Sequence, residues 1–196
     1  MKIFKYLPLL CLFLCTLVSC SETDEAQEYD NWQQRNVQFI DSIASVARAN
    51  ADGTWKVLLA TGLDPQKDWG NEYYVYCKVE QAGTGEEHPI STSTVSVNYS
   101  GRLIPTVKYP EGYIFDASYS GELDPDFDVP VEFALSGTIA GFRLAIENMV
   151  AGTTNTDGDI WRVYIPSALG YGSASQGGIP AYSALIFDIN LVSFVR

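Results

Sequence analysis

Residues 97–103 of the chain read VNYSGRL, residues 114–118 read IFDAS, and residues 130–135 read PVEFAL. Apolar residues alternate with polar ones in the first and third segments. In the first they are Val97 and Tyr99, preceded by Val95, and in the third they are Val131, Phe133 and Leu135. Alternation with a period of two is typical of a strand that buries one face. These segments therefore predict short strands that share one core.

The same period extends to both sides of these segments. It predicts strands at residues 73–80, 94–103, 113–115, 160–165 and 185–191. Between them the spacing changes to that of a helix, whose shared face consists of Ile139, Phe142, Ala145, Ile146 and Met149, with a stop at Gly152. Many short strands around a single helix indicate the α+β class, an antiparallel sheet with one face packed on that helix.

A second helix is predicted ahead of the strands. Asp30 followed by Gln33 is typical of a helix cap, and Gly53 marks the end of the helical stretch. The residues that recur at helical spacing are Trp32, Asn36, Phe39, Ile40, Ile43, Val46 and Ala47. This stripe requires a cover, either the following domain or a second copy in a homodimer, and the sequence leaves both open. Residues 55–59 allow a short strand, followed by a loop.

The first 19 residues have the pattern of a signal peptide. Lys2 and Lys5 precede an apolar run over residues 7–18, which is shorter than the roughly 20 residues of a spanning helix. The run ends in LVSC (17–20), which resembles a bacterial lipobox, so Cys20 is predicted to carry a lipid. An ordinary secretory signal is the alternative. The acidic residues 20–29 then form a tether, and the chain is predicted to be lipid-anchored in the bacterial cell envelope, on the periplasmic or surface-exposed face of the outer membrane.

The composition narrows the functions that the chain can have. It carries 24 acidic and 12 basic residues, a formal net charge of −12, which argues against nucleic acid as a partner. Cys77 is the only cysteine after residue 20, and we interpret it as a small buried hydrophobe rather than a reactive or metal-binding thiol. His88 is the only histidine and lies beside Pro89 in a loop, which argues against a His-based triad and a His-rich metal site.

One acidic stretch could suggest calcium. Asp124, Asp126 and Asp128 alternate, but Val129 stands where a calcium loop needs glycine and Leu135 where it needs a bidentate glutamate. We therefore predict no metal and no cofactor.

Taken in order, the segments from Tyr73 to Phe194 resemble FKBP-type peptidyl-prolyl isomerases. Besides the three quoted above, the matching segments are IAGF (139–142), AIENM (145–149), IP (165–166), YG (171–172), IP (179–180) and LIFDINL (185–191). The resemblance implies a curved antiparallel sheet packed on one short helix, in an isomerase domain at residues 72–196. Residues 30–71 would supply the preceding helix and a connecting segment.

The resemblance also implies a pocket for a proline ring. Phe142 would be its floor, where the family usually has tryptophan, and Asp116 its polar end. Tyr171 would offer its hydroxyl to a substrate carbonyl, and the backbone N–H of Ile139 would offer a second donor. The other residues that the resemblance assigns to the pocket are Tyr99, Phe115 and Phe187 as catalytic walls, and Val131, Phe133, Ile139 and Ile179 as substrate-binding residues.

Prolyl isomerisation suits such a pocket because it breaks no bond. Rotation about a peptide bond costs about 18–20 kcal/mol through lost resonance, and uncatalysed X-Pro exchange takes tens to hundreds of seconds. A dry aromatic slot disfavours the more polar planar amide, while fixed donors hold the flanking carbonyl. The predicted function is isomerisation that assists the folding of exported proteins, with proline-containing peptides or unfolded exported proteins as partners.

Two other functions remain open. The same pocket could hold a peptide or protein without turning it over, as a chaperone-like lipoprotein; Phe142 and the acidic segment 121–128 favour this alternative. A weaker alternative is an adhesin or carbohydrate-binding lipoprotein that uses exposed tyrosines.

Overall fold

The computed structural model describes residues 28–196, of which residues 31–196 form one compact unit. The predicted signal peptide, the lipidated Cys20 and nearly all of the acidic tether lie outside the described residues. No helix in the described part of the chain is long and apolar enough to cross a membrane.

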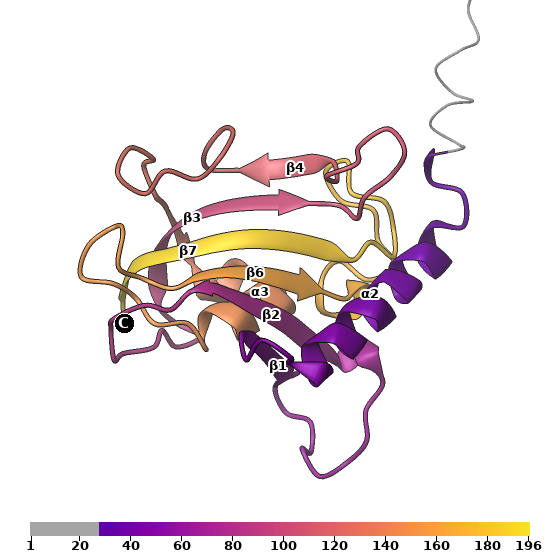
Figure 1. The fold of residues 1–196 in the computed structure, drawn as a ribbon, viewed down its shortest axis with the longest axis horizontal. Helices are drawn as coiled ribbons and strands as arrows, with labels where there is room; N and C mark the ends of the chain where they lie inside the picture. Colours follow the sequence, from indigo (N-terminus) through magenta and orange to yellow (C-terminus); the bar gives the residue numbers. More distant parts are fainter. Residues whose placement is uncertain (1–27) are drawn as a thin grey trace, which may run out of the picture. The chain divides into compact units, whose positions relative to one another are not determined.

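The unit is built on one seven-stranded antiparallel sheet (Figure 1). Its spatial order is β1-β2-β6-β7-β3-β4, and β5 also pairs with β3. The strands are β1 (Trp55–Leu59), β2 (Tyr74–Gln81), β3 (Thr94–Arg102), β4 (Ile114–Ala117), β5 (Val131–Ala134), β6 (Ile160–Ile165) and β7 (Leu185–Val195). The α+β prediction is confirmed, and β1, from the predicted connecting segment, joins the same sheet.

Two α-helices cover opposite faces of the sheet: α2 (Trp32–Ala49) and α3 (Ala140–Ile146). Gly141 of α3 approaches Ile165 of β6 so closely that a Cβ on the glycine would lie 2.3 Å from the Ile165 Cγ2. The Phe39 ring of α2 instead lies 6.1 Å from the ring of Tyr164, the preceding residue of β6. Because neighbouring strand residues point to opposite faces, α2 and α3 lie on different sides of β6.

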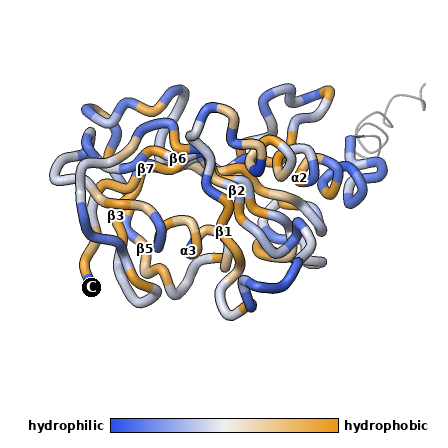
Figure 2. Tube along the Cα trace, turned by 60° about the horizontal axis from the view of Figure 1, so that its bottom comes forward, coloured by the Kyte–Doolittle hydropathy of each residue, from blue (hydrophilic) through white to orange (hydrophobic). Residues whose placement is uncertain are grey.

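The main core lies between the sheet and α3, and Figure 2 shows the apolar residues concentrated in the central strands. Cys77 of β2 is fully buried there opposite Val163, and burial raises the pKa of its thiol far above the ordinary value. A neutral, buried thiol behaves as a small hydrophobe, as the alternation along β2 predicts.

Helix α2 docks on its own domain. Its buried residues are Trp32, Asn36, Ile40, Ala44 and Ala47. At its C-terminal end, the Arg48 guanidinium lies over the ring of Tyr76, and Arg48 Nη1 donates to Asn71 Oδ1 at 2.6 Å. The following domain therefore covers the apolar stripe, although Val46, which was expected on the covered face, is 53% exposed. A homodimer through this helix stays a prediction.

The ends of α2 differ from the prediction. The N-cap residue is Asn31 in a left-handed conformation without a side-chain hydrogen bond, so the predicted Asp30–Gln33 cap is wrong. The helix ends at a left-handed Asn50, whose N–H donates to the Val46 carbonyl, and Gly53 lies in the turn beyond it. Asparagine tolerates this conformation better than most residues, so it can end a helix in place of glycine.

The other boundaries shift because of local hydrogen bonds. Residues Asn71–Tyr73 form the 3₁₀ helix η1, so β2 begins one residue later than predicted. Helix α3 ends at Ile146 rather than near Gly152, because the N–H groups of Asn148 and Met149 donate to carbonyls three residues back instead of four. Strand β7 extends to Val195 by pairing with the start of β3.

The close approach of α3 to the sheet gives the first testable prediction. Gly141→Ala should lower the free energy of unfolding by about 1–3 kcal/mol, because the added methyl group overpacks the contact with Ile165. Gly137→Ala is the matched control, since nothing lies within 4 Å of a Cβ at that position. Chemical denaturation of both variants would measure the difference, and equal stabilities would contradict the packing described here.

Candidate active site

Five aromatic rings from five different elements meet between the sheet and α3. They are Tyr99 of β3, Phe115 of β4, Phe133 of β5, Phe142 of α3 and Phe187 of β7. Phe142 lies centrally, with ring centroids 5.2 Å from Phe187, 6.2 Å from Phe133 and 6.3 Å from Tyr99. Its three contacts are edge-to-face, at 71–81°, which is a favoured geometry for aromatic pairs.

Phe142 is only 4% exposed, whereas Phe115 and Phe133 are half-buried. The cluster therefore has a covered base and partly open sides. The sequence analysis assigns Phe142 to the floor of a proline pocket, and this role stays a prediction.

Gly101 makes the meeting of these rings possible. The register of β3 and β7 places Gly101 directly opposite Phe187. A Cβ on Gly101 would lie 2.6 Å from Phe187 Cε1 and 2.7 Å from Phe115 Cε2, so both rings occupy the space that a side chain would fill. Sequence reasoning missed this role, although a glycine inside a strand is itself a signal of close approach.

The polar end of the cluster is a hydrogen bond. Tyr99 donates its hydroxyl to Asp116 Oδ2 at 2.6 Å. Tyr99 is 8% exposed, whereas Asp116 is exposed. Burial raises the pKa of Tyr99 well above the ordinary value, and the hydrogen bond to the Asp116 carboxylate and its negative charge raise the pKa further. The phenol therefore stays protonated as a donor, and it fixes the orientation of the carboxylate.

Tyr171 lies in the loop after the 3₁₀ helix η3 (Ser167–Leu169), and its side chain is 38% exposed. The Leu169 carbonyl oxygen, two residues earlier, would lie 3.2 Å from a Cβ on Gly141, the residue before Phe142, so this segment reaches α3. Ile139 is the N-cap residue of α3, so its N–H lies ahead of the helical hydrogen bonds.

The remaining predicted site residues are Val131 and Ile179. Val131 begins β5 opposite Val97 of β3, two residues before the Phe133 ring. Ile179 is only 4% exposed, and its backbone is paired with Gln176 in a tight turn. Direct contacts thus join Tyr99, Asp116 and the four phenylalanines, and the substrate contacts of Val131, Ile139 and Ile179 stay predictions.

Two further segments, residues 104–113 and the acidic residues 121–128, have contacts of their own. In the loop at 104–113, the Tyr109 and Tyr113 rings lie 5.1 Å apart, and Val107 is 99% exposed. In the acidic segment 121–128, Asp128 Oδ2 accepts the N–H of Asp124 at 2.7 Å. Within residues 28–196, no group of three or more His, Cys, Asp or Glu side chains could hold a metal ion.

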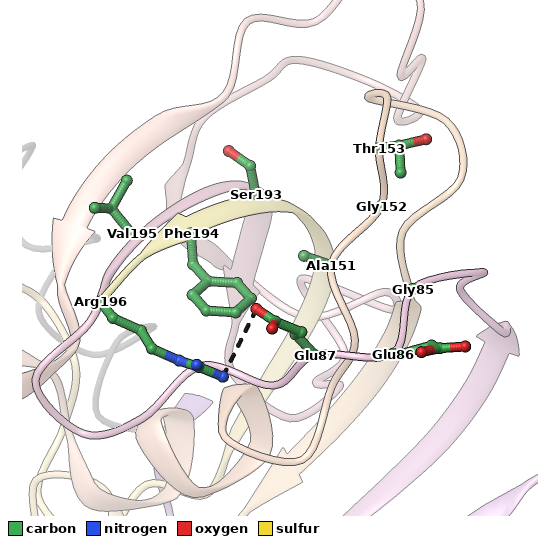
Figure 3. A pocket seen from close by; sticks show the side chains of 10 residues that line it. All are labelled: Gly85, Glu86, Glu87, Ala151, Gly152, Thr153, Ser193, Phe194, Val195 and Arg196. Atoms are coloured by element: carbon green, nitrogen blue, oxygen red, sulfur yellow. Dashed lines mark ion pairs between the residues drawn. The ribbon is translucent and has the colours of Figure 1, made fainter.

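A cavity of about 490 Å³ lies elsewhere, between the end of β7 and two loops (Figure 3). An ion pair crosses it, with Arg196 Nη2 and Glu87 Oε2 3.7 Å apart. None of the predicted proline-site residues belongs to its lining, which consists of Gly85, Glu86, Glu87, Ala151, Gly152, Thr153, Ser193, Phe194, Val195 and Arg196.

The candidate site of this chain is therefore a group of aromatic rings between an antiparallel sheet and one short helix, with one tyrosine–carboxylate pair at its edge. Residues 85–192 match the family described as FKBP-type peptidyl-prolyl cis-trans isomerase. That match covers more than half of the 196 residues, and the chain belongs to this family.

Individual relatives agree with the assignment. The chain is 38% identical over 118 residues to the peptidyl-prolyl cis-trans isomerase Mip of Coxiella burnetii, covering 59% of this chain and 43% of that one. It is 39% identical over 116 residues to FkpA of Escherichia coli, covering 59% and 36%. The chain thus spans less than half the length of these relatives.

A solved structure of an isomerase has a similar fold. The crystal structure of a peptidyl-prolyl cis-trans isomerase from Pseudomonas syringae superposes with a TM-score of 0.56 at 25% identity. The match covers 84% of this chain and 96% of the other.

The raised pKa of Tyr99 predicts a pH dependence of stability. As the pH rises past about 10, the unfolded chain loses this proton while the folded chain retains it, so the free energy of unfolding falls with pH. One such group contributes a slope of about 1.4 kcal/mol per pH unit. Because the unfolded tyrosine is only half deprotonated at pH 10, Tyr99→Phe should flatten the decline between pH 10 and 11 by about 1 kcal/mol in denaturant titrations.

Burial also raises the pKa of the fully buried Tyr76 and of the half-buried Tyr119 and Tyr164, and these tyrosines would keep the rest of the decline in this variant. Equal slopes for the wild-type protein and Tyr99→Phe would show that Tyr99 titrates alike in both states.

Proposed function

We propose that this protein is a peptidyl-prolyl cis-trans isomerase that acts on proline-containing segments of exported proteins as they fold. The observation that carries the proposal is the meeting of five rings around Phe142, with the Tyr99–Asp116 hydrogen bond at their edge. Family membership supports the same reaction, and the names of the relatives from Coxiella and Escherichia carry that activity.

The mechanism follows from the chemistry of the amide. A planar X-Pro amide is more polar than a twisted one because resonance places partial charges on its oxygen and nitrogen. Seating the pyrrolidine against Phe142 and Phe187 removes water from this bond, which costs the planar state more than the twisted state. The rings therefore favour rotation without a nucleophile or general base.

Fixed donors would hold one side of the bond while the other rotates. The Tyr171 hydroxyl and the Ile139 N–H are the donors assigned to the substrate carbonyls, and both belong to segments next to the rings. Asp116, held by Tyr99, would face the carbonyl carbon that becomes more electrophilic as resonance is lost.

The proposed setting is the bacterial cell envelope. LVSC (17–20) supports a signal peptide at residues 1–19 and lipidation of Cys20, followed by the acidic tether. One relative, from Legionella longbeachae, is named outer membrane protein MIP, which favours the same location. In this proposal residues 72–196 are the isomerase domain, and residues 30–71 connect it to the tether.

A second candidate function is peptide binding without turnover. Phe142 favours it, because phenylalanine is smaller than the family's usual tryptophan and lacks its N–H. The exposed acidic loop with Phe127, 83% exposed, also offers a surface for an unfolded or cationic partner.

A peptide assay separates the two functions. Residues 21–196 should accelerate the cis-to-trans conversion of X-Pro peptides, and Tyr171→Phe and Asp116→Ala should each lower kcat/KM by about tenfold or more, because each removes a polar contact to the rotating amide. A rate equal to the buffer blank for several X residues would remove the enzymatic function. Peptide binding without acceleration would support the second candidate.

The floor of the pocket has its own test. Phe142→Trp should raise kcat/KM severalfold, since the larger ring fills the base of the cluster and removes more water from the substrate. The same assay on Phe39→Trp, a substitution on the other face of the sheet, controls for added bulk. No change in Phe142→Trp would mean that the floor does not limit the rate.

A further inference from the structure

Helix α2 lies against the loop that carries Tyr171. We define the Tyr171 loop as residues 167–184, from η3 to the residue before β7. Figure 1 shows α2 beside the end of the sheet where this loop lies. Two buried polar side chains of α2 reach the last two residues of the loop.

The first contact begins at Trp32, which donates its Nε1–H to Ser183 Oγ at 2.9 Å. The Ser183 hydroxyl in turn donates to the Pro180 carbonyl at 2.7 Å, next to Ile179. Ser183 is 4% exposed and Trp32 is 7% exposed, so water cannot readily replace either partner.

The second contact is made by Asn36, which is 3% exposed. Its Oδ1 accepts the N–H of Ala184 at 2.8 Å, and its Nδ2 donates to the Trp32 carbonyl one turn earlier in the helix at 2.7 Å. The amide is thus oriented by the helix and bound to the loop at the same time. Because both ends are satisfied, the side chain has one preferred orientation.

Backbone hydrogen bonds continue from these contacts to Tyr171. The N–H of Tyr182 donates to the Gly172 carbonyl at 2.8 Å, and the N–H of Gly172 donates to the Ser167 carbonyl at 2.8 Å. Tyr182 has a φ of 61°, a left-handed conformation that costs free energy for a non-glycine residue. A strained residue persists only where its surroundings hold it, and here the next two residues are the ones bound to α2.

A cavity lies next to these contacts, at the junction of α2 and the loop. Its volume is about 350 Å³, and its lining includes residues from both sides. The lining residues from α2 are Gln33, Asn36, Val37, Ile40 and Asp41, and those from the Tyr171 loop are Ser167, Tyr182 and Ala184. The hydrogen bonds of Trp32 and Asn36 therefore bridge the two surfaces next to open space.

We propose that Trp32 and Asn36 are positioning residues for the active site: they hold the Tyr171 loop so that the Tyr171 hydroxyl stays beside the ring cluster. The proposal rests on the proposed isomerase function. It makes α2 part of the catalytic apparatus rather than a linker between a tether and a domain. Neither residue touches the substrate, and both act through the loop.

Activity measurements on matched variants test the proposal. Asn36→Ala should lower kcat/KM for an X-Pro peptide about tenfold, and Trp32→Phe, which keeps a ring but loses the N–H, should lower it severalfold. Arg48→Met is the control, because it loosens the other end of the same helix and should leave kcat/KM within about twofold. Comparable losses in all three variants would overturn the proposal.

A double-mutant cycle separates positioning from general destabilisation. In the Tyr171→Phe background, Asn36→Ala should cause little further loss, because the hydroxyl that it positions is already absent. Fully additive losses would show that Asn36 does not act through Tyr171.

Amide hydrogen exchange tests the same contacts without any activity. Asn36→Ala should speed exchange at the Ala184 and Tyr182 amides about tenfold or more, whereas Arg48→Met should not. If the wild-type protein shows no isomerase activity, the proposed function fails, and these rates still decide whether α2 holds the loop. Unchanged exchange in Asn36→Ala would overturn the proposal.

Discussion

Strands β3 and β7 pair over nine positions at the centre of the sheet, and their register determines where the aromatic side chains meet. Gly101 lies opposite Phe187, and the Phe187 ring occupies the space that a side chain at position 101 would fill. A shift of β7 by one residue would turn Phe187 to the other face and separate it from Tyr99 and Phe142. The site therefore depends on backbone pairing before it depends on any side-chain contact.

The two faces of the sheet carry different kinds of side chain. The face toward α3 carries the rings, and the opposite face carries charged residues that neutralise one another, with Arg102 and Arg162 both bound to Asp188. Asp116 is the carboxylate that a buried tyrosine orients at the edge of the rings. A site of this kind acts through dryness and shape, which suits a reaction in which only an amide torsion changes.

Much of this architecture could be predicted from local patterns. The alternation of apolar residues predicts both ends of β6 correctly. It also predicts that Cys77 is buried, because Cys77 shares a strand face with apolar neighbours. The convergence of Phe115, Phe142 and Phe187 could be expected only from the family's order of segments, since periodicity does not show which strands lie side by side. The role of Asn36 could not be predicted, because its partner Ala184 is 148 positions away and offers only a backbone N–H.

The pairing of β2 with β6 affects where the chain can be truncated without exposing a strand edge. The stretch that matches the family begins at residue 85, so it leaves out α2, β1 and β2. A fragment cut at that point would lose the partner of β6, exposing a row of unpaired amide groups together with apolar side chains such as Val163. Bare strand edges of this sort invite association between molecules. A fragment that keeps the sheet intact must therefore begin before residue 85, where the family match starts. The boundaries of an expressed fragment should follow strand pairing rather than sequence similarity.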